Sequence, residues 1–433
     1  MISARGIAGA LADLASTVLG GELPIRFRCW DGSVSGPPDA TIELVFRHRR
    51  ALRRVAWAPN ELGLARAYIA GELDVEGDFV DALGRLYRLI ADGSLRPELD
   101  WAAKRDVVRG AVRLGAVGLP PKPPAEEIKL AGRLHSRTRD ARAISHHYDV
   151  GNDFYALVLG PSMTYSCAFW DEPAETLADA QIAKVDLVAR KLGLTEGMRV
   201  LDVGCGWGTF VIHAAREYGV HAVGVTLSRA QAEFARKRVA EEGLSDRVEI
   251  RVQDYREVPD GPYDAISSIG MAEHVGSAML PTYTRALFDL LRPEGRLLNH
   301  AISRNTLVPP RPDKVSFISR YVFPDGELEP VSAMAAAIEE SGFEVRDVES
   351  LREHYARTLR AWVANLDDRW AEAVRLTSIG RARVWRLYMA ASALAFESGS
   401  IGVNQILAVK PGRGGSSGMP PTRAAMLSRR GDS

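Results

Sequence analysis

The stretch that most constrains the fold of this chain runs from Val200 to Gly208, with the sequence VLDVGCGWG. A short apolar run of this kind is typical of a buried parallel strand, which we expect at residues 199–203. Three glycines follow, and glycine lets the backbone turn tightly and approach a ligand without a Cβ clash. The segment 207–218 then predicts a helix. The run therefore indicates the first strand, ligand loop and crossover helix of a doubly wound α/β sheet.

The spacing of the glycines separates two candidate ligands for this loop. Close backbone approach at a helix N-terminus suits either a pyrophosphate or the amino-acid part of S-adenosylmethionine (SAM). Dinucleotide sites favour the spacing G-x-G-x-x-G, with an acid about twenty residues later. Here the glycines are Gly204, Gly206 and Gly208. This spacing favours SAM.

Bulk properties exclude several classes of protein. A chain of 433 residues is too long for one ordinary core, so we expect two domains. The formal net charge of +0 provides no global field for nucleic acid, and no nucleic-acid partner is expected. Cys29, Cys167 and Cys205 lie far apart, which predicts neither a disulfide framework nor a metal site. Without a signal-like or membrane-spanning segment, the chain is expected to be cytoplasmic.

Composition and pattern divide the chain into four expected parts. Residues 1–118 lack a glycine-rich ligand loop and predict a small α+β domain. Residues 119–127 are rich in proline, which is typical of a stiff, extended linker. Residues 128–411 contain alternating strand and helix patterns, which predict the doubly wound α/β domain. Residues 412–433 are rich in Gly, Ser, Pro and Arg and predict a disordered tail.

Seven strands are expected in the larger domain. They lie at residues 199–203, 222–226, 248–252, 263–268, 295–301, 344–350 and 404–410. Helices are expected between them, notably at 228–243 and 280–291. The stretches 303–340 and 352–400 exceed the usual crossover length. They predict extra helices that form a lid over the carboxyl ends of the strands, where ligands bind in such sheets.

Two further motifs precede the first core strand. They are SHHYDVGNDFY at residues 145–155 and MTYSCAFW at residues 163–170. Together with the glycine run, they make the chain resemble the cyclopropane-fatty-acyl-phospholipid synthase family. This family includes the mycolic acid cyclopropane synthases and actinobacterial enzymes that methylate oleoyl chains. The resemblance covers residues 140–410, and residues 1–118 resemble more loosely the N-terminal domain of the phospholipid-acting members.

The resemblance implies a SAM-dependent methyltransferase with a Rossmann-like domain, helical lid insertions and a small α+β N-terminal domain. It also carries two sets of site residues over to this sequence. One set, around the glycine run and the ends of the next strands, would bind SAM: Tyr148, Tyr165, Ser166, Asp202, Gly204, Gly206, Gly208, Thr226, Leu227, Ser228, Gln231, Asp254 and Tyr255. The other set matches positions that hold a bicarbonate ion in family members: Cys167, Glu273, His300, Ile302 and Tyr355.

The chemistry of such a reaction explains these residue types. An alkene is a poor nucleophile, so the sulfonium methyl must be aligned with its π bond in a dry pocket. Attack leaves a carbocation on the acyl chain, which an apolar, aromatic-lined cavity protects from water. A base must then remove a proton, and bicarbonate held by a histidine, a tyrosine, a carboxylate and backbone amides can serve as that base. Cys167 would line the anion pocket instead of acting as a nucleophile.

Some of these residues could instead have purely structural roles. Cys205 is expected to be a small residue of the backbone turn, and Cys167 could be an ordinary buried thiol. His274 is expected to support the site indirectly. Tyr355 could belong simply to an amphipathic helix. The arginines of residues 48–54 could meet anionic headgroups, and a solvated face is an equal alternative.

The interpretation is a methyl transfer from SAM to the double bond of an oleoyl-type acyl chain in a membrane phospholipid, by an enzyme peripherally associated with the membrane. Direct proton loss gives a cyclopropane. A prior hydride shift gives a 10-methylene chain, which a partner reductase would convert to 10-methylstearate (tuberculostearic acid). A small-amine N-methyltransferase is a further alternative, and the N-terminal domain counts against it. A non-catalytic SAM- or lipid-binding protein is a third. The family suggests a homodimer.

Overall fold

The computed structural model divides the chain into two compact units. It describes residues 6–19, 21, 23–91, 101–128, 150–171, 174–306, 316–324 and 326–427. The first unit comprises residues 1–129, 312–322 and 370–394, and the second comprises residues 130–311, 323–369 and 395–433. None of the described helices is long and apolar enough to cross a membrane.

The division differs from the expected boundary at residues 118–128. Residues 370–394 belong to the first unit, where Arg383 donates to Asp74 at 2.7 Å and to the carbonyl oxygen of Tyr68 at 2.8 Å. The proline-rich segment also lies against this unit, because Arg54 donates to the carbonyl oxygen of Lys122 at 2.8 Å. Local composition could not show these contacts, since they join residues far apart in the sequence.

The first unit has the expected α+β character. Its four-stranded sheet has the order β2-β1-β3-β4, from Val34–Ser35, Ile25–Cys29, Ile42–Phe46 and Leu73–Glu76. In β1, alternate residues are buried against the helices, which is the period of a half-buried strand. The helices of this unit are α1 (Gly6–Leu19), α2 (Arg50–Trp57), α3 (Glu61–Ile69), α4 (Phe79–Ala91), α5 (Trp101–Arg113), α12 (Phe317–Tyr321), α15 (Trp370–Leu376) and most of α16 (Ile379–Glu397).

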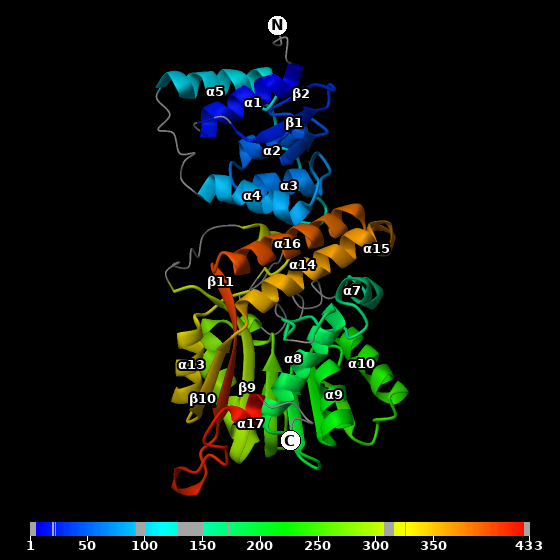
Figure 1. Cartoon of the computed structure of the whole chain (residues 1–433), viewed down its shortest axis with the longest axis vertical. Helices are drawn as coiled ribbons and strands as arrows, with labels where there is room; N and C mark the ends of the chain where they lie inside the picture. The colour runs from blue at the N-terminus through cyan, green and yellow to red at the C-terminus, as the bar shows by residue number, and fades with distance from the viewer. Residues whose placement is uncertain are drawn as a thin grey trace. The chain divides into compact units, whose positions relative to one another are not determined.

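The second unit confirms the doubly wound α/β prediction (Figure 1). Its seven-stranded sheet has the order β10-β11-β9-β8-β5-β6-β7, and β11 runs antiparallel to both of its neighbours. All the expected strands are present: β5 (Arg199–Val203), β6 (His221–Thr226), β7 (Val248–Val252), β8 (Tyr263–Ile269), β9 (Leu291–Arg304), β10 (Glu344–Ser350) and β11 (Ile401–Val409). Strand β5 lies between β8 and β6, and the order of the strands reverses at this point of the sheet. A ligand crevice is therefore expected at the carboxyl end of β5.

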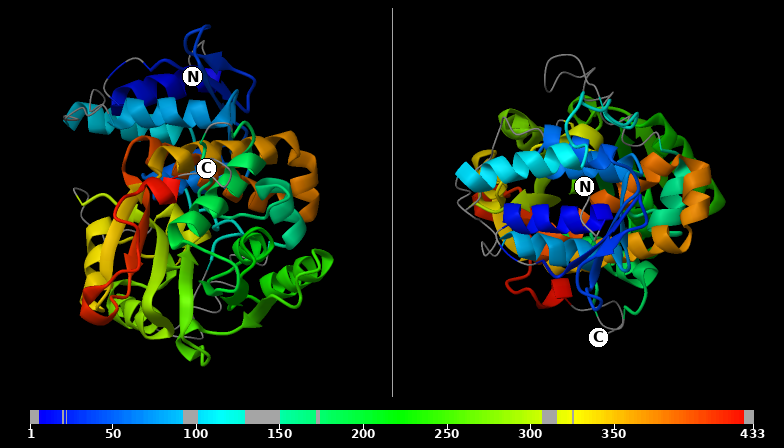
Figure 2. Two further views of the ribbon diagram at one scale, coloured as in Figure 1. Left: turned by 60° about the horizontal axis from the view of Figure 1, so that its bottom comes forward. Right: turned by 90° about the horizontal axis from the view of Figure 1, so that it is seen from above.

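Helices cover both faces of this sheet (Figures 1 and 2). The helices of this unit are α7 (Asn152–Leu159), α8 (Leu177–Leu192), α9 (Thr209–Tyr218), α10 (Arg229–Glu241), α11 (Leu280–Leu290), α13 (Val331–Glu340), α14 (Arg352–Asp368) and α17 (Ala424–Leu427), and α7 and α14 lie beyond the ends of the strands. Successive strand residues point to opposite faces. Val200 and Leu298 therefore pack with α8, α9 and α10, whereas Leu201 and Leu297 pack with α11 and α13.

The chain beyond residue 412 differs from the expected disordered tail as far as residue 427. Met426 is buried in the same core cluster as α8 and α9. Its carbonyl oxygen accepts a hydrogen bond from Arg190 at 3.2 Å, and Arg423 forms an ion pair with Asp347 at 2.5 Å. A few anchoring contacts thus order a segment whose average composition is polar and flexible.

Candidate active site

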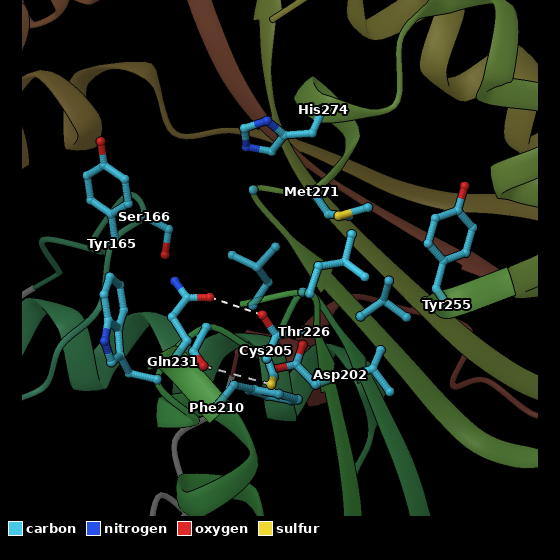
Figure 3. Close-up of a pocket in the computed structure, with 18 of the residues that line it drawn as sticks. Tyr165, Ser166, Asp202, Cys205, Phe210, Thr226, Gln231, Tyr255, Met271 and His274 are labelled. Carbon is cyan, nitrogen blue, oxygen red and sulfur yellow. Dashed lines mark hydrogen bonds between the residues drawn. The ribbon is translucent and has the colours of Figure 1, made fainter. Parts of the chain in front are cut away.

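A cavity of about 450 Å³ opens at the carboxyl ends of β5 and β6 (Figure 3). Most of the predicted SAM residues line it: Tyr165, Ser166, Asp202, Gly204, Gly206, Thr226, Leu227, Gln231, Asp254 and Tyr255. Gly208 and Ser228 do not line it, and Tyr148 lies outside the described residues. The sequence therefore identified most of the wall of this cavity.

The glycines of the loop have different structural tasks. All three have left-handed backbones, with φ of 82° at Gly204, 54° at Gly206 and 82° at Gly208. A Cβ on Gly206 would meet no atom within 4 Å, so its backbone stands open to a ligand. A Cβ on Gly208 would lie 3.1 Å from the Cβ of Ala235 on α10. Gly208 thus permits close packing of α9 against α10 instead of lining the cavity.

Ser228 has a comparable supporting role at the end of β6. Its hydroxyl oxygen accepts a hydrogen bond from the backbone N–H of Gln231 at 3.3 Å and caps α10. The carboxamide oxygen of Gln231 accepts a hydrogen bond from Thr226 at 3.0 Å, drawn in Figure 3. The cap therefore places the Gln231 side chain in the cavity wall.

Buried charge lies at the base of the cavity. Asp202, the last but one residue of β5, accepts a hydrogen bond from Ser267 at 2.6 Å, and burial raises the pKa of its carboxyl to about 6. Lys184 of α8 is 2% exposed and donates to the hydroxyl oxygen of Ser166 at 2.9 Å. Burial lowers the pKa of this ammonium to about 8. Lys184 was not among the predicted site residues, because a lysine on an amphipathic helix usually faces solvent and the sequence gives no sign of its burial.

The opposite wall holds Asp254 and Tyr255. Asp254 caps a short helix at residues 255–257 and accepts two hydrogen bonds from the guanidinium of Arg256, at 2.8 and 2.5 Å. Tyr255 packs edge-on against Tyr283 with ring centroids 5.5 Å apart. In Figure 3, Tyr255 and Tyr165 lie on opposite sides of the cavity.

Aromatic rings form a continuous cluster on the Tyr165 side, and Tyr165 and Trp207 of this cluster line the cavity. Tyr165 packs against Tyr155 at 5.6 Å and against Trp362 at 5.5 Å between ring centroids. Tyr155 also contacts Trp207 at 4.7 Å, and Trp362 contacts Tyr355 at 6.0 Å. Such a cluster excludes water and presents π faces that favour positive charge.

Glu273 and Ile302 of the second predicted set are in direct contact. Strand β8 ends at Ile269, so the next backbone N–H groups of β9 lose their strand partner. The carboxylate of Glu273 takes that place and accepts a hydrogen bond from the N–H of Ile302 at 2.7 Å. Its other oxygen, Oε2, is buried without a hydrogen-bond partner in the described part of the chain. Burial raises the pKa of Glu273 to about 7.

His300 lies two residues before Ile302 on β9 and is 2% exposed. Neither ring nitrogen has a hydrogen-bond partner within the described ranges. Burial, together with the charges of Lys184 and Lys191, holds the pKa of His300 well below its ordinary value. The imidazole is therefore neutral at physiological pH, with one donor and one acceptor nitrogen.

The sulfur of Cys167 and the backbone N–H of Tyr355 both contact the Leu351 carbonyl group. The Leu351 carbonyl oxygen accepts the backbone N–H of Tyr355 at 3.0 Å and lies 3.6 Å from the sulfur of Cys167. Burial raises the pKa of the Cys167 thiol far above its ordinary value, so the sulfur stays protonated. The sulfur is therefore not the thiolate that a nucleophilic cysteine needs.

The second set lies beside the cavity and not in its wall. None of Cys167, Glu273, His300, Ile302 and Tyr355 lines the main cavity, and Glu273 and Ile302 line a separate small space of about 20 Å³. Cys167 and Glu273 each adjoin a lining residue in the chain, Ser166 and His274. His274, for which an indirect role was expected, lines the cavity itself, and burial lowers its pKa to about 4.

Comparison with known proteins identifies the family of this chain. The family model described as mycolic acid cyclopropane synthetase matches residues 135–406. The chain belongs to this family. It is 43% identical over 414 residues to a probable fatty acid methyltransferase, Rv3720, of Mycobacterium tuberculosis, which covers 92% of this chain and 94% of the relative. It is 38% identical over 287 residues to the cyclopropane-fatty-acyl-phospholipid synthase of Escherichia coli, which covers 65% and 72%.

Solved structures agree with the assignment to the mycolic acid cyclopropane synthetase family. The cyclopropane synthase MmaA2 from Mycobacterium tuberculosis matches with a TM-score of 0.60 and 34% identity, over 64% of this chain and 99% of that one. The mycolic acid cyclopropane synthase CmaA1, in complex with S-adenosylhomocysteine (SAH), matches with a TM-score of 0.59 and 35% identity, over 62% and 98%. The prediction of a SAM-dependent methyltransferase with a Rossmann-like fold is confirmed.

Proposed function

We propose that this protein transfers the methyl carbon of SAM to the double bond of an unsaturated, oleoyl-type acyl chain in a membrane phospholipid. The observation that carries the proposal is the pair of buried, incompletely paired groups, Glu273 and His300, next to the SAM-type cavity. Buried polar atoms are normally hydrogen-bonded, so unpaired ones of this kind indicate a small polar ligand.

The residues fit a bicarbonate ion at this place. A neutral His300 offers one N–H donor, and a Glu273 carboxyl whose pKa is about 7 can carry a proton and donate as well. Both groups can therefore bind an anion without placing a second unpaired negative charge in the core. Bicarbonate held there would supply a base for the proton loss that ends the reaction.

The remaining chemistry falls to the cavity and its aromatic wall. The methyl carbon forms a bond to one alkene carbon as its bond to sulfur breaks, and SAH leaves as a neutral thioether. The neighbouring carbon becomes cationic. Rings of Tyr165 and Trp207 line the cavity, and Trp362 supports Tyr165 from behind. These rings hold water away and stabilise positive charge.

Two products are compatible with this site. Proton loss from the transferred methyl group gives a cyclopropane, whereas a prior hydride shift gives a methylene group that a partner reductase could convert to a methyl branch. Among the relatives, a tuberculostearic acid methyltransferase, UfaA1, of Mycobacterium tuberculosis is 34% identical over 94% of this chain. The E. coli cyclopropane synthase matches over only 65%. The match along both units favours the methylene product.

Mass spectrometry of lipids tests this proposal. The full-length protein would be expressed in cells rich in oleoyl phospholipid, and we expect acyl chains that gain one CH₂ group. Ozonolysis would then cleave a methylene product and leave a cyclopropane intact. The variant His300→Gln should lose the activity, and the exposed His221→Gln should retain it. Absence of the mass gain from folded protein that binds SAM would refute lipid methylation and direct the search to small amines.

The first unit carries a surface suited to a membrane, and we propose that it contacts anionic phospholipid. Trp57, Val117 and Leu119 are 59%, 60% and 86% exposed. The indole N–H of Trp57 donates to the carbonyl oxygen of Gly118 at 2.9 Å, which holds these apolar groups together. Exposed Arg49 and Arg50 lie at the start of the same helix, α2, and Arg47 precedes it; Arg47 and Arg50 also form ion pairs with Asp74 and Glu72. Apolar and basic groups together are typical of lipid-facing surfaces.

Sedimentation with liposomes tests this surface. The double variant Trp57→Ser, Leu119→Ser should bind vesicles of anionic phospholipid more weakly than the unchanged protein. A double variant at the exposed Val108 and Val112 of α5 is the matched control. Equal loss of binding in both double variants would contradict a surface centred on Trp57.

A further inference from the structure

A buried glutamine on β11 has no role in the proposed reaction. Gln405 is 0% exposed, and neither its Nε2 nor its Oε1 has a hydrogen-bond partner among the residues that the structure describes. An unpaired buried amide is costly, so native proteins rarely keep one without a reason.

Another buried glutamine shows what a structural role looks like in this fold. Gln181 of α8 is also 0% exposed. Its Nε2 donates to the carbonyl oxygens of Leu159 at 3.0 Å and Thr164 at 3.3 Å, and its Oε1 accepts from Ser162 at 2.6 Å. Both polar atoms of Gln181 thus have hydrogen-bond partners, whereas both polar atoms of Gln405 have none among the described residues.

The sheet register places Gln405 directly opposite His300. Strands β11 and β9 are antiparallel and pair Gln405 with His300. The Cβ atoms of such pairs lie about 4.5–5.5 Å apart, and their side chains share a face of the sheet. On its other side Gln405 is paired with Glu349 of β10, whose carboxylate is already bound by Lys191. The available polar neighbour is therefore His300, whose ring nitrogens are also unpaired within the described chain.

We propose that Gln405 is a positioning residue for His300: its carboxamide hydrogen-bonds one ring nitrogen and so holds the imidazole in one orientation at the reaction site. A neutral imidazole has one donor and one acceptor, and a carboxamide has both, so the two groups are complementary. A partner on one ring nitrogen fixes the orientation of the ring and thus the direction in which the other nitrogen points. The bond requires a turn of the flexible glutamine side chain, and such contacts often tighten only in the complex. This inference rests on the proposed role of His300.

The variant Gln405→Met tests the inference, with Gln181→Met as the matched control. Methionine keeps the length of the side chain and removes both polar atoms. We expect Gln405→Met to lower kcat for lipid methylation about 10- to 100-fold and to leave KM for SAM unchanged. Losses of this size follow when the hydrogen-bond partner of a metal-binding histidine is removed. Its thermal midpoint should fall less than that of Gln181→Met, because Gln405 would lose only the proposed bond to His300, whereas Gln181 would lose three hydrogen bonds.

A direct measurement on the His300 ring separates this inference from the proposed function. Full-length protein labelled with ¹⁵N-histidine reports the ring nitrogens, and His300→Asn assigns the signal. We expect the chemical shift of one His300 ring nitrogen to change in Gln405→Met, because that nitrogen loses its hydrogen-bond partner. An identical His300 signal in both proteins would overturn the inference, as would unchanged kcat. If the enzyme methylates no lipid, the ring-nitrogen measurement still decides the part played by Gln405, whereas the proposed function alone fails.

Discussion

Replacement of Glu273 by glutamine should change how the stability of the protein depends on pH. Burial raises the pKa of Glu273 from 4.5 to about 7. The folded state therefore holds this proton more tightly than the unfolded state does. The stabilisation is fully present below pH 4.5 and is lost as the pH rises through 7. At 1.36 kcal/mol for each pH unit, the complete change is about 3 kcal/mol.

Most of this change falls between pH 5 and pH 8, where we expect about 2–3 kcal/mol. Glutamine has no proton to lose, and its carbonyl oxygen can still accept the N–H of Ile302, as Glu273 does at 2.7 Å. The variant Glu273→Gln should therefore gain stability relative to the unchanged protein as the pH rises. Its lipid methylation should nevertheless be lost, because the carboxyl group would no longer hold the anion.

Urea denaturation at pH 5 and at pH 8 measures this difference. The comparison is between the unchanged protein, Glu273→Gln and the control Glu196→Gln, whose side chain is exposed. The control should follow the unchanged protein at both pH values. A difference between Glu273→Gln and the unchanged protein that is the same at both pH values would refute the argument from burial.

Three further changes test the site and its surroundings. Lys184→Met should raise the pKa of Asp202, because the Lys184 charge lowers it. The loss of SAM binding at low pH, measured by calorimetry, should then begin at a higher pH. An unchanged pH dependence would contradict the coupling between Lys184 and Asp202. Gly206→Ala should weaken SAM binding more than it lowers the thermal midpoint, whereas Gly208→Ala should mainly lower the midpoint, since its Cβ would crowd α10. Met426→Ala should cost about 2 kcal/mol or more of unfolding free energy, and no loss would show that the C-terminal segment does not stabilise the fold.

The proposed SAM cavity was largely predictable, because its residues follow strands in recognisable patterns. Gly204 and Gly206 adopt left-handed backbones that other residues rarely tolerate, so their positions in the sequence already indicate a loop. Lys184 was not predicted, since a lysine on an amphipathic helix usually faces solvent. Only the packing of α8 shows that it is buried against Ser166.

The sequence by itself determined the strand and helix order of the second unit, since apolar runs and glycine turns are local properties of the chain. It also identified the family and the residues that match its motifs. Only the tertiary structure decided that residues 370–394 join the first unit and that Gln405 stands opposite His300. Strand register and burial are set by contacts between residues far apart in the chain. Desolvation, which changes the pKa values of Glu273 and His300, therefore appears only once those contacts exist.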